Sequence, residues 1–170
     1  DYDKENYIIG EVADFNDRVM KVQFEEKSIE IGKNDTIRET DVSFKFNQDS
    51  KITNAKIVFN LDSANLIQIL SVVSIQNNLL LDSVRYEKDK TEIKVRFKEN
   101  YVNNLPSLRL KIKSETDDNF QTHLIAKIIE TNKCNCVKIW DGDKIAVTKL
   151  KADTVISVNE EKIIGNLNIE

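Results

Sequence analysis

The chain has 170 residues, of which 40% are hydrophobic and 32% charged, and its formal net charge is −4. This length predicts one domain with enough chain to bury a substantial core. The acidic balance argues against a dedicated nucleic-acid binder, which normally carries a basic excess. No apolar run approaches the roughly 20 residues that a membrane-spanning helix needs.

Alternation of apolar and polar residues is the dominant pattern along the chain. It recurs in residues 42–46, 55–59, 93–97 and 108–112. This period of two is typical of half-buried strands. Turn-forming residue types separate the strands, notably at 32–35, 87–90, 117–119 and 141–143. Short strands at this spacing predict an all-β fold, namely an antiparallel β-sandwich of about nine strands.

The segment from Phe59 to Val73 fits two kinds of secondary structure. Its second half could be a helix with Leu66, Ile69, Leu70 and Val73 on one stripe, or a strand with Ile67, Ile69 and Val73 on one face. Periodicity alone cannot separate the two over so short a run. Because the surrounding segments read as strands, we expect a turn at 62–63, then a strand over 67–75 buried on much of both faces.

Residues that could carry catalysis or bind a metal are scarce. His123 is the only histidine, and we interpret it as an edge or partly buried residue of a strand. Cys134 and Cys136 are expected to be free thiols, because a disulfide across one intervening residue would be strained. Neither a glycine-rich phosphate loop nor a calcium loop is present. We therefore expect no enzyme activity, no cofactor and no metal site.

Basic side chains occupy the outward positions of two consecutive predicted strands. The first strand carries Lys94, Arg96 and Lys98, and the second carries Arg109, Lys111 and Lys113. One interpretation is a solvated face that discourages pairing at the sheet edge. The other is a positive patch for an acidic partner.

Read in order, the segments resemble a cohesin module, the receptor half of the cohesin–dockerin pair. The resemblance covers residues 18–158. It rests on VMKVQFEEKSIEIGKNDTIRETDVSFKF for the first two strands and ITNAKIVFNLDSANLIQILSVV for the third and fourth. TEIKVRFKEN resembles strand six, SLRLKIKSETDDNFQTHLIAKI strands seven and eight, and TVISV the terminal strand. The glycine- and proline-rich turns usual in the family are missing.

The resemblance implies a jelly-roll-like sandwich that does no chemistry and receives a helical, dockerin-type partner on one sheet face. That face would comprise the outward residues of about 54–60, 83–86, 91–98 and 122–129. The strands at 91–98 and 107–113 would then belong to opposite sheets. The partner-binding residues implied in this sequence are Asn54, Lys56, Val58, Asn60, Lys94, Arg96 and Lys98.

The domain organisation expected from the sequence has three parts. Residues 1–17 are a lead-in, 18–158 form the binding module, and 159–170 are a linker or the start of a next module. We expect an extracellular or cell-surface location in a larger bacterial protein, with a protein partner and no nucleic acid. The alternative function is a structural spacer or adhesin repeat of a surface or phage-tail assembly.

Overall fold

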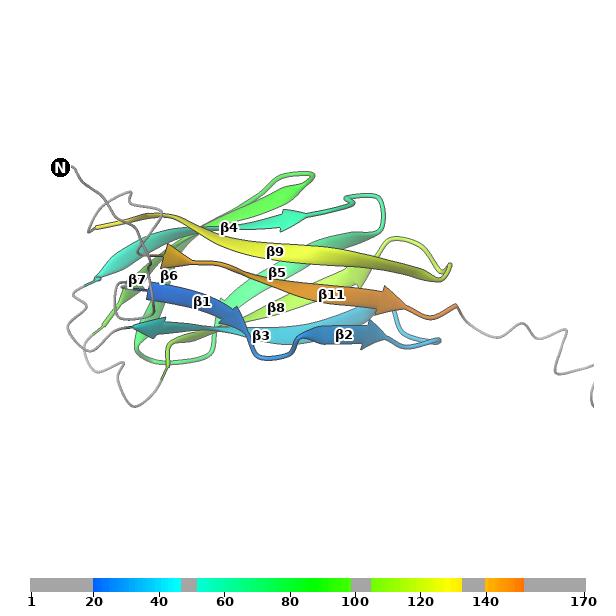
Figure 1. Cartoon of the computed structure of the whole chain (residues 1–170), viewed down its shortest axis with the longest axis horizontal. Helices are drawn as coiled ribbons and strands as arrows, with labels where there is room; N and C mark the ends of the chain where they lie inside the picture. Colours follow the sequence, from blue (N-terminus) through cyan, green and yellow to red (C-terminus); the bar gives the residue numbers. More distant parts are fainter. Residues whose placement is uncertain (1–19, 47–51, 99–104, 133–139, 152–170) are drawn as a thin grey trace, which may run out of the picture.

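The computed structural model of the chain describes residues 20–46, 52–98, 105–132 and 140–151. Within these ranges every regular element is a β-strand, and the strands pack as two sheets face to face (Figure 1). In chain order the strands are β1 (Met20–Phe24), β2 (Ser28–Ile31), β3 (Ile37–Phe46), β4 (Asn54–Leu61), β5 (Ile67–Ser74), β6 (Leu79–Tyr86), β7 (Lys90–Phe97), β8 (Ser107–Ser114), β9 (Phe120–Thr131), β10 (Trp140–Asp141) and β11 (Asp143–Lys149). The predicted all-β, mostly antiparallel sandwich is confirmed.

The two sheets contain five and six strands. Their orders are β10-β1-β3-β8-β5 and β2-β11-β9-β4-β7-β6. Neighbouring strands are antiparallel except for the pairs β1–β10 and β2–β11, which are parallel. Figure 1 shows β2 and β11 side by side and pointing the same way. The first and last described segments of the chain are therefore joined by backbone hydrogen bonds in both sheets.

The described residues form eleven strands rather than about nine because two segments each change sheet. Residues 20–31 supply β1 to one sheet and β2 to the other, and residues 140–149 divide in the same way into β10 and β11. Where both segments cross, a carboxylate oxygen of Asp143 accepts a hydrogen bond of 2.8 Å from the backbone N–H of Phe24.

The prediction of a turn at 141–143 is therefore wrong, since these residues carry the chain onward from one sheet to the other. Gly142 fits this crossing because a Cβ atom there would lie 2.5 Å from the carbonyl oxygen of Ala126. Non-bonded heavy atoms do not approach so closely, and only glycine lets the crossing pack against β9.

The segment from Phe59 to Val73 contains a strand, as predicted, and not a helix. Strand β4 ends at Leu61, and the N–H of Leu66 then closes a turn onto the carbonyl of Ser63 at 3.2 Å. Strand β5 follows in the opposite sheet, at its edge. The expected burial on both faces is wrong, because Leu70 and Val73 are 42% and 47% exposed.

The core consists of the inward-facing residues of both sheets, and one aromatic cluster joins the two. Phe44 of β3 and Phe97 of β7 are buried in opposite sheets, and their ring centroids lie 5.4 Å apart in an edge-to-face arrangement. Phe46 meets the same Phe97 ring at 4.9 Å. These contacts fix how the outer faces lie relative to each other.

Several predictions concern residues outside the described ranges. They are the strand at 155–158, the state of Cys134 and Cys136, and the segments 1–17 and 159–170. The proposed division of the chain into three parts stays a prediction. Within the described ranges, the last strand of the sandwich is β11, which the sequence pattern had not singled out.

Candidate partner-binding face

The outward side chains of β9, β4, β7 and β6 form one continuous sheet face, because these four strands are neighbours in the six-stranded sheet. Strand β8, which carries Arg109, Lys111 and Lys113, lies in the other sheet. The expectation that the two basic strands belong to opposite sheets is thus confirmed. The two basic rows are separate surfaces and do not form one patch.

Cross-strand register places most of the predicted binding residues opposite one another or opposite a charged residue. Asn54 lies opposite Arg96, Lys56 opposite Lys94, and Asn60 opposite Lys90. Lys98 is exposed and directly follows the last residue of β7. The side chains of β4 at 54, 56, 58 and 60 share the outer face, since side chains alternate along a strand.

Val58 lies on this outer face but is only 7% exposed. Its cross-strand neighbours are Glu92 on β7 and Lys127 on β9. Long side chains on both sides can cover a valine with their methylene groups. Val58 therefore packs beneath the charged side chains, and little of its own surface is accessible to a partner.

An ion-pair network crosses all four strands of the face. Arg85 of β6 lies 3.0 Å from one carboxylate oxygen of Glu92, and Lys56 of β4 lies 3.1 Å from the other. Lys56 also approaches Glu130 of β9 at 3.9 Å. Glu92 is the centre of the network, with a side chain only 13% exposed. Networks of several charges hold side chains more firmly than isolated surface pairs do.

The surroundings of Glu92 favour its charged form. The hydrogen bond from Lys56 is the main cause that lowers the pKa of Glu92 below its ordinary 4.5. Burial acts in the opposite direction, and the charges of Lys56 and Arg85 lower the pKa further. The carboxylate therefore stays ionised across the physiological range and keeps both cations in place.

We expect Glu92→Gln to reduce the loss of stability at acidic pH. The pKa of Glu92 is lower in the folded chain than in the unfolded chain. Its stabilising effect is therefore complete above pH 4.5 and is lost as the pH falls through the folded value. Urea denaturation at pH values from about 7 to about 3 measures how the free energy of unfolding changes with pH.

The matched control for this prediction is Glu115→Gln, because Glu115 is exposed and lies outside the network. Its pH dependence should follow that of the original chain. Equal slopes in the Glu92 and Glu115 variants would show that the network does not stabilise the folded state through Glu92.

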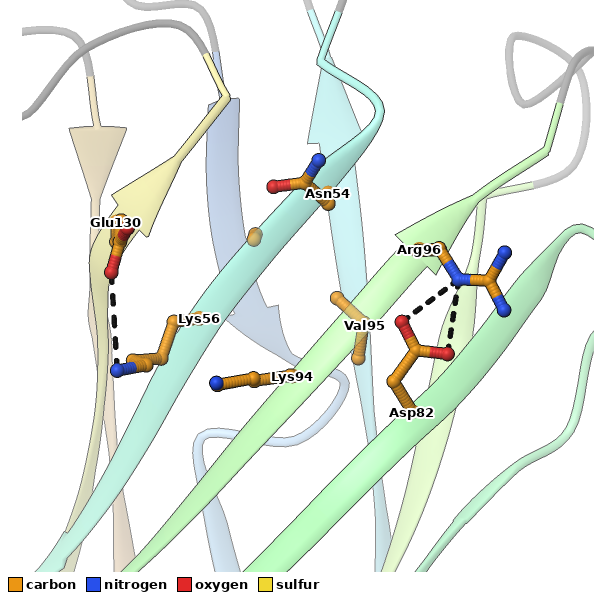
Figure 2. A pocket seen from close by; sticks show the side chains of 8 residues that line it. Asn54, Lys56, Asp82, Lys94, Val95, Arg96 and Glu130 are labelled. Carbon is orange, nitrogen blue, oxygen red and sulfur yellow. Dashed lines mark hydrogen bonds and ion pairs between the residues drawn. The ribbon is translucent and has the colours of Figure 1, made fainter.

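A pocket of about 300 Å³ opens on this face between β4, β7, β6 and β9 (Figure 2). Its polar lining consists of Asn54, Lys56, Asp82, Lys94, Arg96 and Glu130. Four of these residues were among the predicted binding residues, and the two carboxylates were not. The Nε atom of Arg96 donates to both carboxylate oxygens of Asp82, at 3.0 and 2.8 Å.

Two β-bulges place the carboxylates at the rim of this pocket. Asp82 is the extra residue in β6, between Leu81 opposite Val95 and Ser83 opposite Lys94. In β9 the register skips Ile129, which brings Glu130 opposite Lys56. A bulge re-aims side chains in this way. Strict alternation along either strand does not show where these two acids lie.

His123 lies on β9 between two neighbouring strands, so it is partly buried in the sheet but not at its edge. Its Nδ1 atom is 3.4 Å from a carboxylate oxygen of Asp62. The backbone N–H of Asp62 also donates to the carbonyl of His123 at 3.2 Å. These two contacts hold the turn after β4 against β9, so His123 has a structural role.

In residues 20–46, 52–98, 105–132 and 140–151, no three His, Cys, Asp or Glu side chains gather closely enough to hold a metal ion. The same ranges contain no helix with the length and apolar character to cross a membrane.

The arrangement defines a β-sandwich module with an outer sheet face that is crossed by an ion-pair network. No protein-family model and no curated protein matches the sequence. Among solved structures, the chain is similar to a cohesin module of a family 33 glycoside hydrolase from Clostridium perfringens. The TM-score is 0.56 at 13% identity, over 79% of this chain and 98% of that module.

Two further solved structures show the same likeness. One is a type I cohesin–dockerin complex from Clostridium thermocellum, with a TM-score of 0.51 and 15% identity over 84% of this chain and 99% of the matched chain. The other is CaCohA2 from Clostridium acetobutylicum, with a TM-score of 0.52 and 11% identity over 78% of this chain and 92% of that one. The chain therefore has a cohesin-like fold. At these identities the likeness extends to the fold alone.

Proposed function

We propose that the chain is a non-catalytic protein-binding module that receives a dockerin-type helical partner on the outer face of β9, β4, β7 and β6. The observation that carries this proposal is the network linking Arg85, Glu92, Lys56 and Glu130 across all four strands. Side chains already held in place lose less conformational freedom when a partner binds. The face is thus prepared for binding before the partner arrives.

The shape of the face supports a protein partner rather than a small substrate. A pocket of about 300 Å³ is at the lower end of the range for small-molecule sites and has room for one side chain. The fold supports the same proposal, since the matched Clostridium thermocellum structure is a cohesin–dockerin complex. We also propose that the module works outside the cell or at its surface, as part of a larger protein.

The test is a pair of triple charge reversals, measured for binding to a panel of purified dockerin modules by calorimetry. The first variant reverses Lys94, Arg96 and Lys98 to Glu, and the second reverses Arg109, Lys111 and Lys113. We expect the first to weaken binding by more than about tenfold, and the second by less than about threefold.

The two variants are matched in local chemistry. Each contains one arginine whose Nε atom lies 2.8 Å from an aspartate, Arg96 with Asp82 and Arg109 with Asp41. Each also contains two lysines that have no ion pair among the described residues. Equal losses in both variants would place the binding surface elsewhere. No binding to any dockerin would leave the spacer or adhesin function as the better account.

A further inference from the structure

Three cations and two carboxylates line the pocket on the partner-binding face. Lys56 is paired with Glu92 and Glu130, and Arg96 is paired with Asp82. Lys94 lies between these two groups and has no ion pair among the residues that the structure describes. Figure 2 shows the Lys94 side chain extending toward Lys56, with the Arg96–Asp82 pair on its other side.

The position of Lys94 is unfavourable in the unbound chain. Lys94 of β7 is directly opposite Lys56 of β4, and like charges facing each other across neighbouring strands are destabilising. Of the carboxylates that Lys56 contacts, Glu130 is on β9, and Glu92 is on β7, two residues before Lys94. A negative group between the two ammonium groups would remove this repulsion.

Free hydrogen-bond donors point to the kind of group that fits. Among the described residues Lys94 has no ion pair, whereas Arg96 is turned toward Asp82, and Figure 2 shows its guanidinium on the side away from Lys94. The ammonium groups of Lys94 and Lys56 can serve the oxygens of a carboxylate placed between them, since a carboxylate accepts several donors. Asp82 and Glu130 at the rim would repel a dianionic phosphate or a polyanion more strongly than a single carboxylate.

We propose that this pocket binds one aspartate or glutamate side chain of an acidic protein partner, and that Lys94 recognises its carboxylate. This inference rests on the proposed function, because it specifies the chemistry of a partner bound on that face. The lining of the pocket has one cation more than it has carboxylates, which contrasts with the net charge of −4 of the whole chain. It would steer an acidic partner to this face and away from the rest of the surface.

The test uses an alanine-based helical peptide with one stripe of glutamates, and the same peptide with glutamine at each of those positions. Both are titrated into the ¹⁵N-labelled chain and followed by amide chemical shifts. We expect only the glutamate peptide to shift the amides of 54–56 and 94–96. Lys94→Gln should weaken this binding at least about fivefold, whereas Lys113→Gln on the opposite sheet should leave it unchanged.

Three outcomes would overturn the inference. They are equal shifts with both peptides, no shift at the pocket, and equal effects of the Lys94 and Lys113 variants. Heparin is titrated in parallel. If heparin bound the pocket through Lys94 more tightly than the glutamate peptide did, the inference would also be overturned. If dockerins bind but the peptide result fails, only this inference is lost. If the peptide result holds and no dockerin binds, the dockerin assignment is lost and the acidic-partner inference stands.

Discussion

Replacing Phe44 with alanine is expected to lower the free energy of unfolding by about 3–5 kcal/mol. Phe44 has no exposed surface, so the substitution leaves a cavity in the core that the surrounding strands can only partly fill. It also removes the edge-to-face contact with Phe97, which joins the two sheets. Urea denaturation measures the loss, and the melting temperature should fall by roughly 10 °C.

Two comparison variants separate the aromatic contact from general loss of volume. Phe44→Leu keeps most of the apolar volume without the ring and should fall between the original chain and the alanine variant. Phe120→Ala, at a half-buried position of β9, should cost less than half as much. If Phe120→Ala destabilises the chain as strongly as Phe44→Ala, the aromatic cluster is not a main support of the sandwich.

Alternation predicted most of the fold because one face of each strand meets the core and the other meets solvent. This holds for β3, β4, β7 and β8, whose buried residues are all hydrophobic, serine or threonine. It also decided the ambiguous segment at 67–74, because the segments around it alternate as strands do. The exposed outer face of β5 was missed because it carries apolar residues such as Leu70 and Val73, which a sequence pattern reads as buried.

The crossing at 141–143 was missed for a different reason. Asp and Gly favour turns by their residue types, but here each has a specific tertiary role. Asp143 accepts the N–H of Phe24, and Gly142 allows close approach to Ala126. Neither contact is visible in a local pattern, because the partners are far away in the sequence.

The candidate site was predictable in its basic half and not in its acidic half. Lys94, Arg96 and Lys98 follow simple alternation along β7. The acids of the pocket are Asp82 of β6, which pairs with Arg96, and Glu130 of β9, which approaches Lys56. Their positions depend on bulges at Asp82 and Ile129. Since a bulge inserts one residue without a sequence signature, outward and inward positions beyond it cannot be assigned from alternation.

Lys149→Met is expected to lower the free energy of unfolding by about 2–3 kcal/mol. Lys149 ends β11 at an inward position and is only 1% exposed. Its ammonium donates to the carbonyl oxygens of Gly32 and Asp35, each at 2.8 Å, and approaches that of Lys33 at 3.4 Å. Methionine fills much of the same space but leaves these carbonyls without their charged donor.

The expected size of this effect follows from how the buried charge is satisfied. A buried ammonium is costly unless its donors are used, and here three carbonyls receive them. The same bonds tie the loop between β2 and β3 to the end of β11, beside the parallel pairing of β11 with β2. Hydrogen exchange should therefore speed up at 32–35 in the variant before it does so in the central strands.

The control is Lys144→Met, which makes the same chemical change at an exposed position of the same strand. It should alter the free energy of unfolding by less than about 0.5 kcal/mol. If the two variants are equally stable, water replaces the ammonium at the three carbonyls without cost. If Lys149→Met is less stable but exchange at 32–35 is unchanged, the lysine acts through packing at the end of the sandwich and does not hold the loop.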